Sequence, residues 1–213
     1  MPNNKHFYKL ILGDFKSNCY IYQFDNMAII IDPACAGSTI ADHLKSINCQ
    51  LKAIFITHGH QDHIGAVDYL YNIYKCDVIA HYNDHDLIAG TDQSKILQIP
   101  SLKGIKVNAP VKYFNDEFQS WNINGVIVDG ILTPGHTAGS VTYVLRDENK
   151  IFAGDTVFKG GVGKTESPTS SKEDLRKSIG IYKTFKKQCK IYPGHGPSTT
   201  VDSELKENDY FKY

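Results

Sequence analysis

Residues 57–65, THGHQDHIG, contain four potential metal ligands within six positions: His58, His60, Asp62 and His63. The apolar run LKAIFIT before them predicts a buried strand, and a helix is expected just after them. In an extended loop His58 and His60 point the same way, because alternate residues share a face. Asp62 and His63, at the helix start, can turn towards the same space. The spacing therefore predicts a metal site, the alternative being a polar loop that merely contains histidines.

Three more potential ligands each follow a short predicted strand. His136 lies in the turn of ILTPGHTAG, Asp155 follows the strand of KIFAGDTVF, and His195 lies in the turn of KIYPGHG. Open α/β sheets place their sites at the carboxyl ends of strands, and the adjacent glycines allow close backbone approach. Seven ligands exceed the four that one zinc ion takes, so they predict two metal ions that share a carboxylate. Imidazole and carboxylate without cysteine suit zinc, iron or manganese, and a pair of such ions suits hydrolysis.

The remaining histidines have no comparable pattern, and we expect them to be surface or structural groups. They are His6, His43, His81 and His85.

The first half of the chain alternates predicted strands and helices, which must position the ligands. Five runs rich in Ile, Val and Tyr predict strands: KLILG, SNCYIYQF, MAIIID, LKAIFIT (51–57) and DVIAHY (77–82). Apolar residues at helical spacing predict helices over residues 38–48 and 63–75, the second with Ile64, Val67, Leu70 and Ile73 on one face. We expect a short helix in NDHDLIAG and mostly loop from there to Pro110.

The second half predicts further strands in VKYF, NGVIVDGILTP, SVTYVLRD, KIFAGD and KIYP. Ser171 and Asp174 resemble a capping box at the start of a helix that continues to Tyr182. Residues 201–213 form a polar tail that is expected to be partly helical. The whole pattern predicts a mixed α/β protein with helices outside two central sheets, in a single domain over residues 1–213.

The composition restricts the classes of function. Lys and Arg total 23 and Asp and Glu total 23, which argues against binding nucleic acid or a membrane surface through bulk charge. The five cysteines form no C-x-x-C pair and suit a reducing compartment. No apolar run is long enough to span a membrane, and MPNNKHFYKL lacks the core of a signal peptide. We therefore expect a cytoplasmic protein; its oligomeric state stays open.

The segment FKGGVGKTE (158–166) ends like a phosphate-binding loop of the pattern G-x-x-x-x-G-K-[ST]. Phe158 occupies the position of the first glycine, and Pro168 follows too soon for a helix to begin at the GKT sequence. A nucleotide site is therefore not expected. The glycines would instead let the loop lie close over the metals, with Lys164 at the rim as a cation for a substrate carboxylate. A solvated surface lysine is the alternative.

THGHQDHIG, PGHTAGS, GDTVF and PGHGP match, in this order, the motifs of the metallo-β-lactamase superfamily. The chain most resembles the short, single-domain relatives of glyoxalase II (hydroxyacylglutathione hydrolase). The resemblance implies a four-layered αβ/βα sandwich with the metals between its two sheets. It also implies a first metal held by His58, His60 and His136, a second held by Asp62, His63 and His195, and Asp155 as the bridge.

The same resemblance implies a dinuclear-metal hydrolase that cleaves a small thioester, such as S-lactoylglutathione, by attack of a metal-bridging hydroxide. Asp62 and Asp155 would hold and orient the hydroxide, and a thiolate leaves readily because a thiol has a pKa of about 8.5. In glyoxalase II relatives a basic residue at the position of Lys164 contacts glutathione. Here Thr165 and Glu166 replace the aromatic residue expected beside it, and no C-terminal helical domain is expected, so the preferred thiol stays open.

Other functions of the same motifs also remain open. An iron-dependent persulfide dioxygenase would use one metal at the first site, and the same two-metal centre could hydrolyse lactones or phosphodiesters. A metal-bound binding or sensor module is disfavoured, because structural sites are fully ligated whereas seven ligands leave two ions with open positions. The acyl group, the metals loaded and any general acid are not fixed by the sequence.

Overall fold

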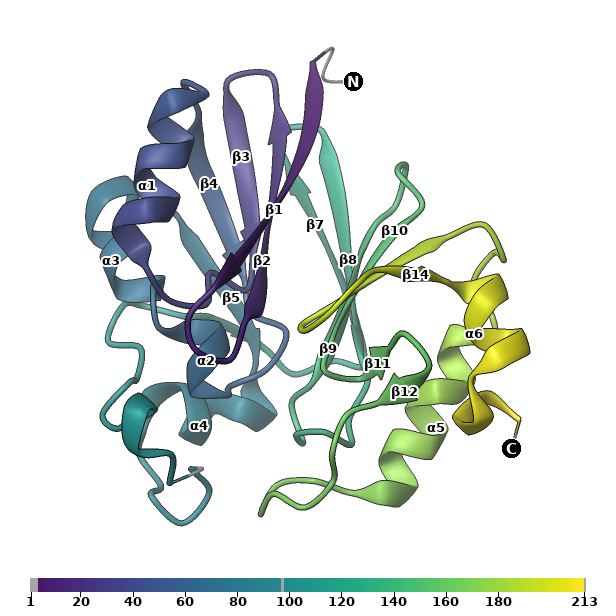
Figure 1. Ribbon diagram of the computed structural model, residues 1–213. Helices are drawn as coiled ribbons and strands as arrows, with labels where there is room; N and C mark the ends of the chain where they lie inside the picture. The colour runs from purple at the N-terminus through teal and green to yellow at the C-terminus, as the bar shows by residue number, and fades with distance from the viewer. Residues whose placement is uncertain (1–3, 97, 213) are drawn as a thin grey trace.

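Two six-stranded sheets face one another in the computed structural model, which describes residues 4–96 and 98–212 (Figure 1). The first sheet has the order β1 (Lys5–Leu12), β2 (Ser17–Phe24), β3 (Met27–Ile31), β4 (Gln50–Phe55), β5 (Asp77–His81), β6 (Lys112–Phe114). The second has the order β14 (Thr199–Thr200), β13 (Lys190–Pro193), β10 (Lys150–Gly154), β9 (Val141–Leu145), β8 (Val126–Leu132), β7 (Phe118–Ile123). A small hairpin, β11 (Val157–Phe158) with β12 (Gly161–Val162), follows β10.

Helices cover the outer face of each sheet, which confirms the predicted αβ/βα sandwich (Figure 1). α1 (Gly37–Ser46) and α3 (Val67–Tyr74) pack on the first sheet, and α5 (Lys172–Tyr182) and α6 (Val201–Glu207) on the second. Shorter elements complete the chain: α2 (Gln61–Ile64), α4 (His85–Ala89) and the 3-10 turns η1 (Tyr82–Asp84), η2 (Pro100–Leu102) and η3 (Asp209–Phe211). None of the helices in the described ranges combines the length and apolar composition that a membrane crossing requires.

Alternate residues of the central strands pack into different layers of the core. On β2, Ile21 joins the cluster beneath α1 and α3, whereas Tyr20 and Tyr22 lie in the cluster between the two sheets. On β4, Ile54 lies in the cluster beneath the helices and Phe55 lies in the cluster between the two sheets. Both faces of β4 are therefore covered, which explains why its sequence is continuously apolar.

A single helix was predicted over residues 63–75, and this prediction was wrong. The structure has two helices there, α2 and α3. The backbone of Ala34 separates them: its N–H donates to the carbonyl of His63 (3.0 Å), and its carbonyl accepts from the N–H of Ala66 (2.8 Å). The carbonyl of His63 is thereby taken by a residue outside the helix. Ile73, predicted on the inner face, is 52% exposed.

The strand β7 was missed, because it lies at a sheet edge and its side chains are exposed or half-buried. It forms a hairpin with β8, in which Asn124 (φ 51°) and Gly125 (φ 93°) make the connection. An Asn-Gly pair favours this turn, since both residues tolerate positive φ. The helix start predicted at Ser171 is confirmed. Ser171 Oγ accepts from the N–H of Asp174 (3.2 Å) at the start of α5.

Candidate metal centre

The structure brings all seven predicted ligands together at one end of the two sheets. His58 and His60 lie in the loop after β4, and Asp62 and His63 lie in α2. The others follow strands of the second sheet: His136 after β8, Asp155 after β10 and His195 after β13. Loops after buried strands thus place side chains from opposite sheets within a few ångströms of one another.

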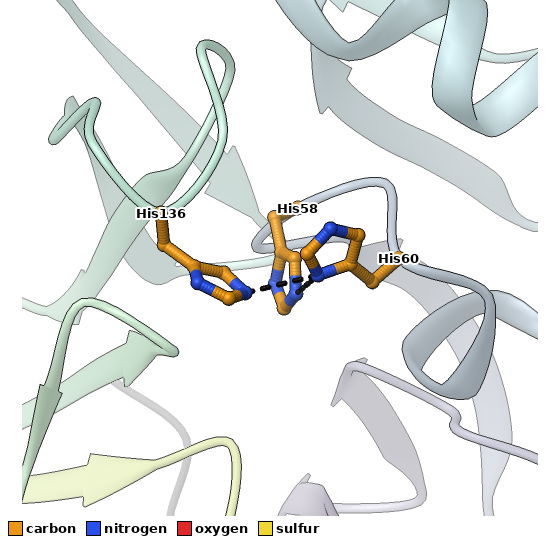
Figure 2. A group of neighbouring side chains, drawn as sticks. All are labelled: His58, His60 and His136. Carbon is orange, nitrogen blue, oxygen red and sulfur yellow. Dashed lines mark hydrogen bonds between the residues drawn. The ribbon is translucent and has the colours of Figure 1, made fainter. Parts of the chain in front are cut away.

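Three imidazole rings converge in the first group (Figure 2). His60 Nδ1 lies 3.1 Å from His58 Nε2 and 2.9 Å from His136 Nε2. Burial lowers the pKa of His58, and it lowers the pKa of His60 to about 3, with the neighbouring histidines adding to the effect. The rings of His58 and His60 are therefore neutral at pH 7, which is the form that binds a metal, and with His136 they turn ring nitrogens towards a common point.

The second group combines a carboxylate with two imidazoles. His63 Nε2 lies 3.2 Å from His195 Nε2, and Asp62 Oδ2 lies 3.4 Å from the former and 3.3 Å from the latter. Burial alone would lower the pKa of His63, but the carboxylates of Asp62, Asp155 and Asp32 raise it to about 10. The negative charge concentrated here favours a cation, as a proton or as a metal ion.

Asp155 lies between the two groups. Its Oδ2 is 3.6 Å from His136 Nε2 of the first group and 3.5 Å from His195 Nε2 of the second. Its Oδ1 is buried, 3.7 Å from His63 Nε2, and has no hydrogen-bond partner among the residues that the structure describes. A buried carboxylate oxygen without a partner is costly, and a cation would satisfy it. The donor set and this oxygen fit two divalent cations that share Asp155.

Oxygen acceptors orient the second nitrogen of several rings. His63 Nδ1 donates to Asp32 Oδ2 (2.9 Å), His136 Nδ1 to the carbonyl of Lys164 (2.8 Å) and His195 Nδ1 to the carbonyl of Phe15 (3.0 Å). Each bond keeps a proton on Nδ1, so that Nε2 is the nitrogen that a metal can bind.

Asp32 is a site residue that the sequence interpretation missed. With His58 and His63 it forms a third group able to hold a metal, but both its oxygens already accept from Thr57: Oδ1 from the N–H (2.7 Å) and Oδ2 from Oγ1 (2.6 Å). We therefore assign it an orienting role. The sequence feature that could have identified Asp32 is its position directly after the buried strand MAIII.

Lys164 contributes its backbone to the centre, through the bond to His136, while its side chain is exposed. Gly163 beside it makes the close approach possible. A Cβ at Gly163 would lie 1.9 Å from the carbonyl oxygen of Asp155 and 3.0 Å from His136 Nδ1. The loop therefore lies close over the candidate centre, as its glycines indicated.

Asp84, in the turn before α4, is a second residue that the sequence did not reveal. Its buried carboxylate accepts three bonds of 2.7 Å: Oδ2 from Gly59 N and Thr137 Oγ1, and Oδ1 from Gly139 N. Gly59 lies between His58 and His60, and Thr137 follows His136. One carboxylate thus ties together the two loops that carry the first group.

We expect Asp84→Asn to lower metal affinity at the first group by about 10- to 100-fold, as for other residues that orient ligands. Asparagine has one acceptor oxygen, so in either orientation its NH₂ group faces a backbone N–H, of Gly59 or of Gly139. Competition with a chromogenic chelator measures the affinity. The control is Asp86→Asn, which changes a partly exposed carboxylate paired with Lys95 (2.5 Å). Equal affinities in both variants would show that Asp84 does not position the ligands.

The four remaining histidines lie outside these groups in the part of the chain that the structure describes. His81 is buried and its Nδ1 accepts from Asn83 N (3.2 Å), and His43 packs edge-on against Tyr8. His85 lies beside Asp86, and His6 is exposed.

Comparison with known proteins agrees with this geometry. A model of the metallo-beta-lactamase superfamily matches residues 12–195. The probable metallo-hydrolase YqgX of Bacillus subtilis (strain 168) is 30% identical over 95% of both chains. The hydroxyacylglutathione hydrolase GloC of Haemophilus influenzae is 28% identical over 92% of this chain and 93% of its own.

A solved structure shows the same arrangement of layers. The crystal structure of the BLEG-1 B3 metallo-beta-lactamase superposes with a TM-score of 0.90, at 27% identity, over 98% of this chain and 100% of its own. The match to the family model spans all seven predicted ligands, from the loop after β4 to His195. Fold, motif order and convergence of the ligands agree, and the chain belongs to the metallo-beta-lactamase superfamily.

Proposed function

We propose that this chain is a hydrolase with two metal ions that cleaves a small thioester such as S-lactoylglutathione. The position of Asp155 between the two groups carries the proposal, because a shared carboxylate is what a pair of close ions requires. The first ion would be held by His58, His60 and His136, the second by Asp62, His63 and His195, with Asp155 shared. Zinc is the first candidate for this donor set, with iron or manganese as alternatives.

The residues have separable roles in this chemistry. When bound, the two ions would supply a hydroxide nucleophile at neutral pH and polarise the thioester carbonyl. Asp62, whose Oδ2 accepts from Ser17 Oγ (2.8 Å), and Asp155 would hold and orient the attacking water. Asp32 keeps His63 in the tautomer that presents Nε2. The leaving thiolate is stable near neutral pH, so the reaction needs no strong general acid.

The choice of a thioester is supported by similarity to a hydroxyacylglutathione hydrolase along nearly the whole chain. We propose a small-molecule substrate and no nucleic-acid partner. The formal net charge of the chain is zero, whereas binding to nucleic acid relies on an excess of positive charge.

The proposal is tested with purified, zinc-loaded protein and a panel of substrates. We expect chelator-sensitive hydrolysis of S-lactoylglutathione, with kcat/KM at least about 100-fold above that for a simple lactone or a β-lactam. Oxygen uptake by iron-loaded protein with glutathione persulfide tests the dioxygenase alternative. Oxygen uptake without thioester hydrolysis, or a lactone preferred to every thioester, would reject the proposed reaction.

Removal of the metals is expected to lower thermal stability as well as activity. Each site that binds only the folded protein stabilises it by about 2.7 kcal/mol at a free metal concentration of 100 Kd. For a chain of this size, each kcal/mol shifts Tm by roughly 2–4 °C, so one site corresponds to about 5–11 °C. Differential scanning fluorimetry with and without chelator measures the shift. An unchanged Tm would contradict metal binding by the folded centre.

A further inference from the structure

A cavity of about 210 Å³ borders the second group of ligands, between the turn that joins β1 to β2, helix α2 and η2 (Figure 1). Four of the side chains that line it are apolar: Leu12, Phe15, Leu102 and Ile105. Sites that take a whole small-molecule ligand measure roughly 300 to 1,000 Å³, so a cavity of this size suits one part of a substrate.

One end of the cavity belongs to the candidate metal centre itself. Asp62 and Ser17 both line it, and Ser17 Oγ donates to Asp62 Oδ2 (2.8 Å), the oxygen that lies 3.3 Å from His195 Nε2. Phe15, another lining residue, accepts from His195 Nδ1 through its carbonyl (3.0 Å). A member of the second group is thus part of the cavity wall, and no loop separates a ligand in the cavity from Asp62.

The cavity deepens from a polar mouth to an apolar interior. Asp14 and Ser101 are exposed, whereas Ser17 and Leu102 are buried, so the end at Ser17 and Asp62 is the inner one. Within the part of the chain that the structure describes, its lining includes two carboxylates, Asp14 and Asp62, and no lysine or arginine. Carboxylates without a cation disfavour an anionic ligand, and the apolar walls favour an aliphatic one.

We propose that this cavity binds the acyl chain of the substrate, and that the preferred chain is aliphatic and longer than a lactoyl group. The inference rests on the proposed thioester hydrolysis and names the class of acyl group that the site takes. The reacting carbonyl lies at the Asp62 end, and the chain runs past Leu102 and Ile105 towards the mouth. The thiol part of glutathione carries carboxylates, which Asp14 repels, so that part leaves the centre in another direction.

The first test measures kcat/KM of the zinc-loaded protein for the acetyl, butanoyl and hexanoyl thioesters of glutathione. Because the thiol is the same in all three, only the acyl chain differs. We expect kcat/KM to rise about fourfold for each methylene group added, which is the factor that corresponds to burying one methylene. Equal values for the three substrates, or values that fall with chain length, would overturn the inference.

The second test compares Ile105→Asp with Ile99→Asp. Both isoleucines are half-buried and flank η2, but Ile99 lines a different cavity. A carboxylate at position 105 is expected to lower the hexanoyl-to-acetyl ratio of kcat/KM by at least about tenfold, because a buried aliphatic chain would then face a charge. Ile99→Asp should leave the ratio unchanged. Loss of folded protein lowers both values equally and does not alter the ratio, so an equal change in the two variants would contradict the assigned cavity.

Cys35, in the loop after β3, also lines the cavity and reports its occupancy without turnover. The other four cysteines are buried, so iodoacetamide should alkylate Cys35 first. Burial and the carboxylates of Asp14 and Asp62 raise the pKa of the Cys35 thiol, and the reaction is therefore run at alkaline pH.

The ligands are two thioethers that the protein cannot hydrolyse, used with metal-free protein. S-hexylglutathione, at about ten times its Kd, is expected to slow alkylation of Cys35 about tenfold, whereas S-methylglutathione at the same concentration leaves the rate unchanged. Equal rates with the two thioethers, or a Cys35 that iodoacetamide does not reach, would overturn the inference. If the protein cleaves no thioester, the proposed function fails, and the protection of Cys35 still decides whether the cavity takes an aliphatic chain.

Discussion

Asp155→Ala is expected to lower kcat/KM for the thioester by at least about 10³-fold, which corresponds to about 4 kcal/mol of transition-state stabilisation. The carboxylate reaches both groups of ligands, at 3.6 Å from His136 Nε2 and 3.5 Å from His195 Nε2. Without it the two groups lose their shared anion, and metal bound per chain should fall below two. Steady-state kinetics and metal analysis of the same preparation measure both effects.

The matched control is Asp147→Ala, which removes an exposed carboxylate from the turn between β9 and β10. That turn lies at the opposite end of β10 from Asp155, so activity and metal content should remain those of the wild type. Circular dichroism of both variants shows whether the fold is kept. Turnover within tenfold of wild type in a folded Asp155→Ala protein would refute the assigned site.

Gly163→Ala is expected to lower kcat/KM by about 10²-fold, although alanine adds only a methyl group. Its Cβ would lie 1.9 Å from the carbonyl oxygen of Asp155 and 3.0 Å from His136 Nδ1, so the loop or the ligands must move. A displacement of about 1 Å at a catalytic centre is enough for a loss of this size. The change should appear in kcat and in metal affinity together.

Gly161→Ala, two positions earlier in β12, provides the comparison. Within residues 4–96 and 98–212, no atom lies within 4 Å of a Cβ placed at Gly161, and φ of Gly161 is not positive, so alanine fits there without strain. Activity close to wild type is therefore expected for Gly161→Ala. Equal losses in the two variants would mean that the flexibility of the loop, and not its close approach to Asp155 and His136, determines the rate.

The layers and the convergence of the ligands could be predicted because both depend on local patterns. Continuous apolar strands predicted sheets buried on both faces, and β4 confirmed this with Ile54 and Phe55 in different clusters. Histidines and aspartates directly after such strands predicted a common edge. The structure brings these seven side chains together there.

The partners of the residues that orient the ligands could not be predicted, because they are distant in sequence. Asp32 contacts His63, 31 positions later, and Asp84 contacts Thr137 and Gly139, 53 and 55 positions later. A single carboxylate carries no signal of such a partner. The break between α2 and α3 has the same origin, since Ala34 takes the carbonyl of His63 from another part of the chain. Lys164 was singled out for its side chain, whereas the structure shows its backbone carbonyl bonded to His136.

The central claim is that these seven side chains hold two metal ions that act together on a thioester. It is tested most directly by titrating metal-free protein with zinc while measuring hydrolysis of S-lactoylglutathione. The account predicts that the rate rises until two equivalents per chain are bound, and that chelator abolishes it. A rate that saturates at one equivalent, or no hydrolysis with two ions bound, would contradict it.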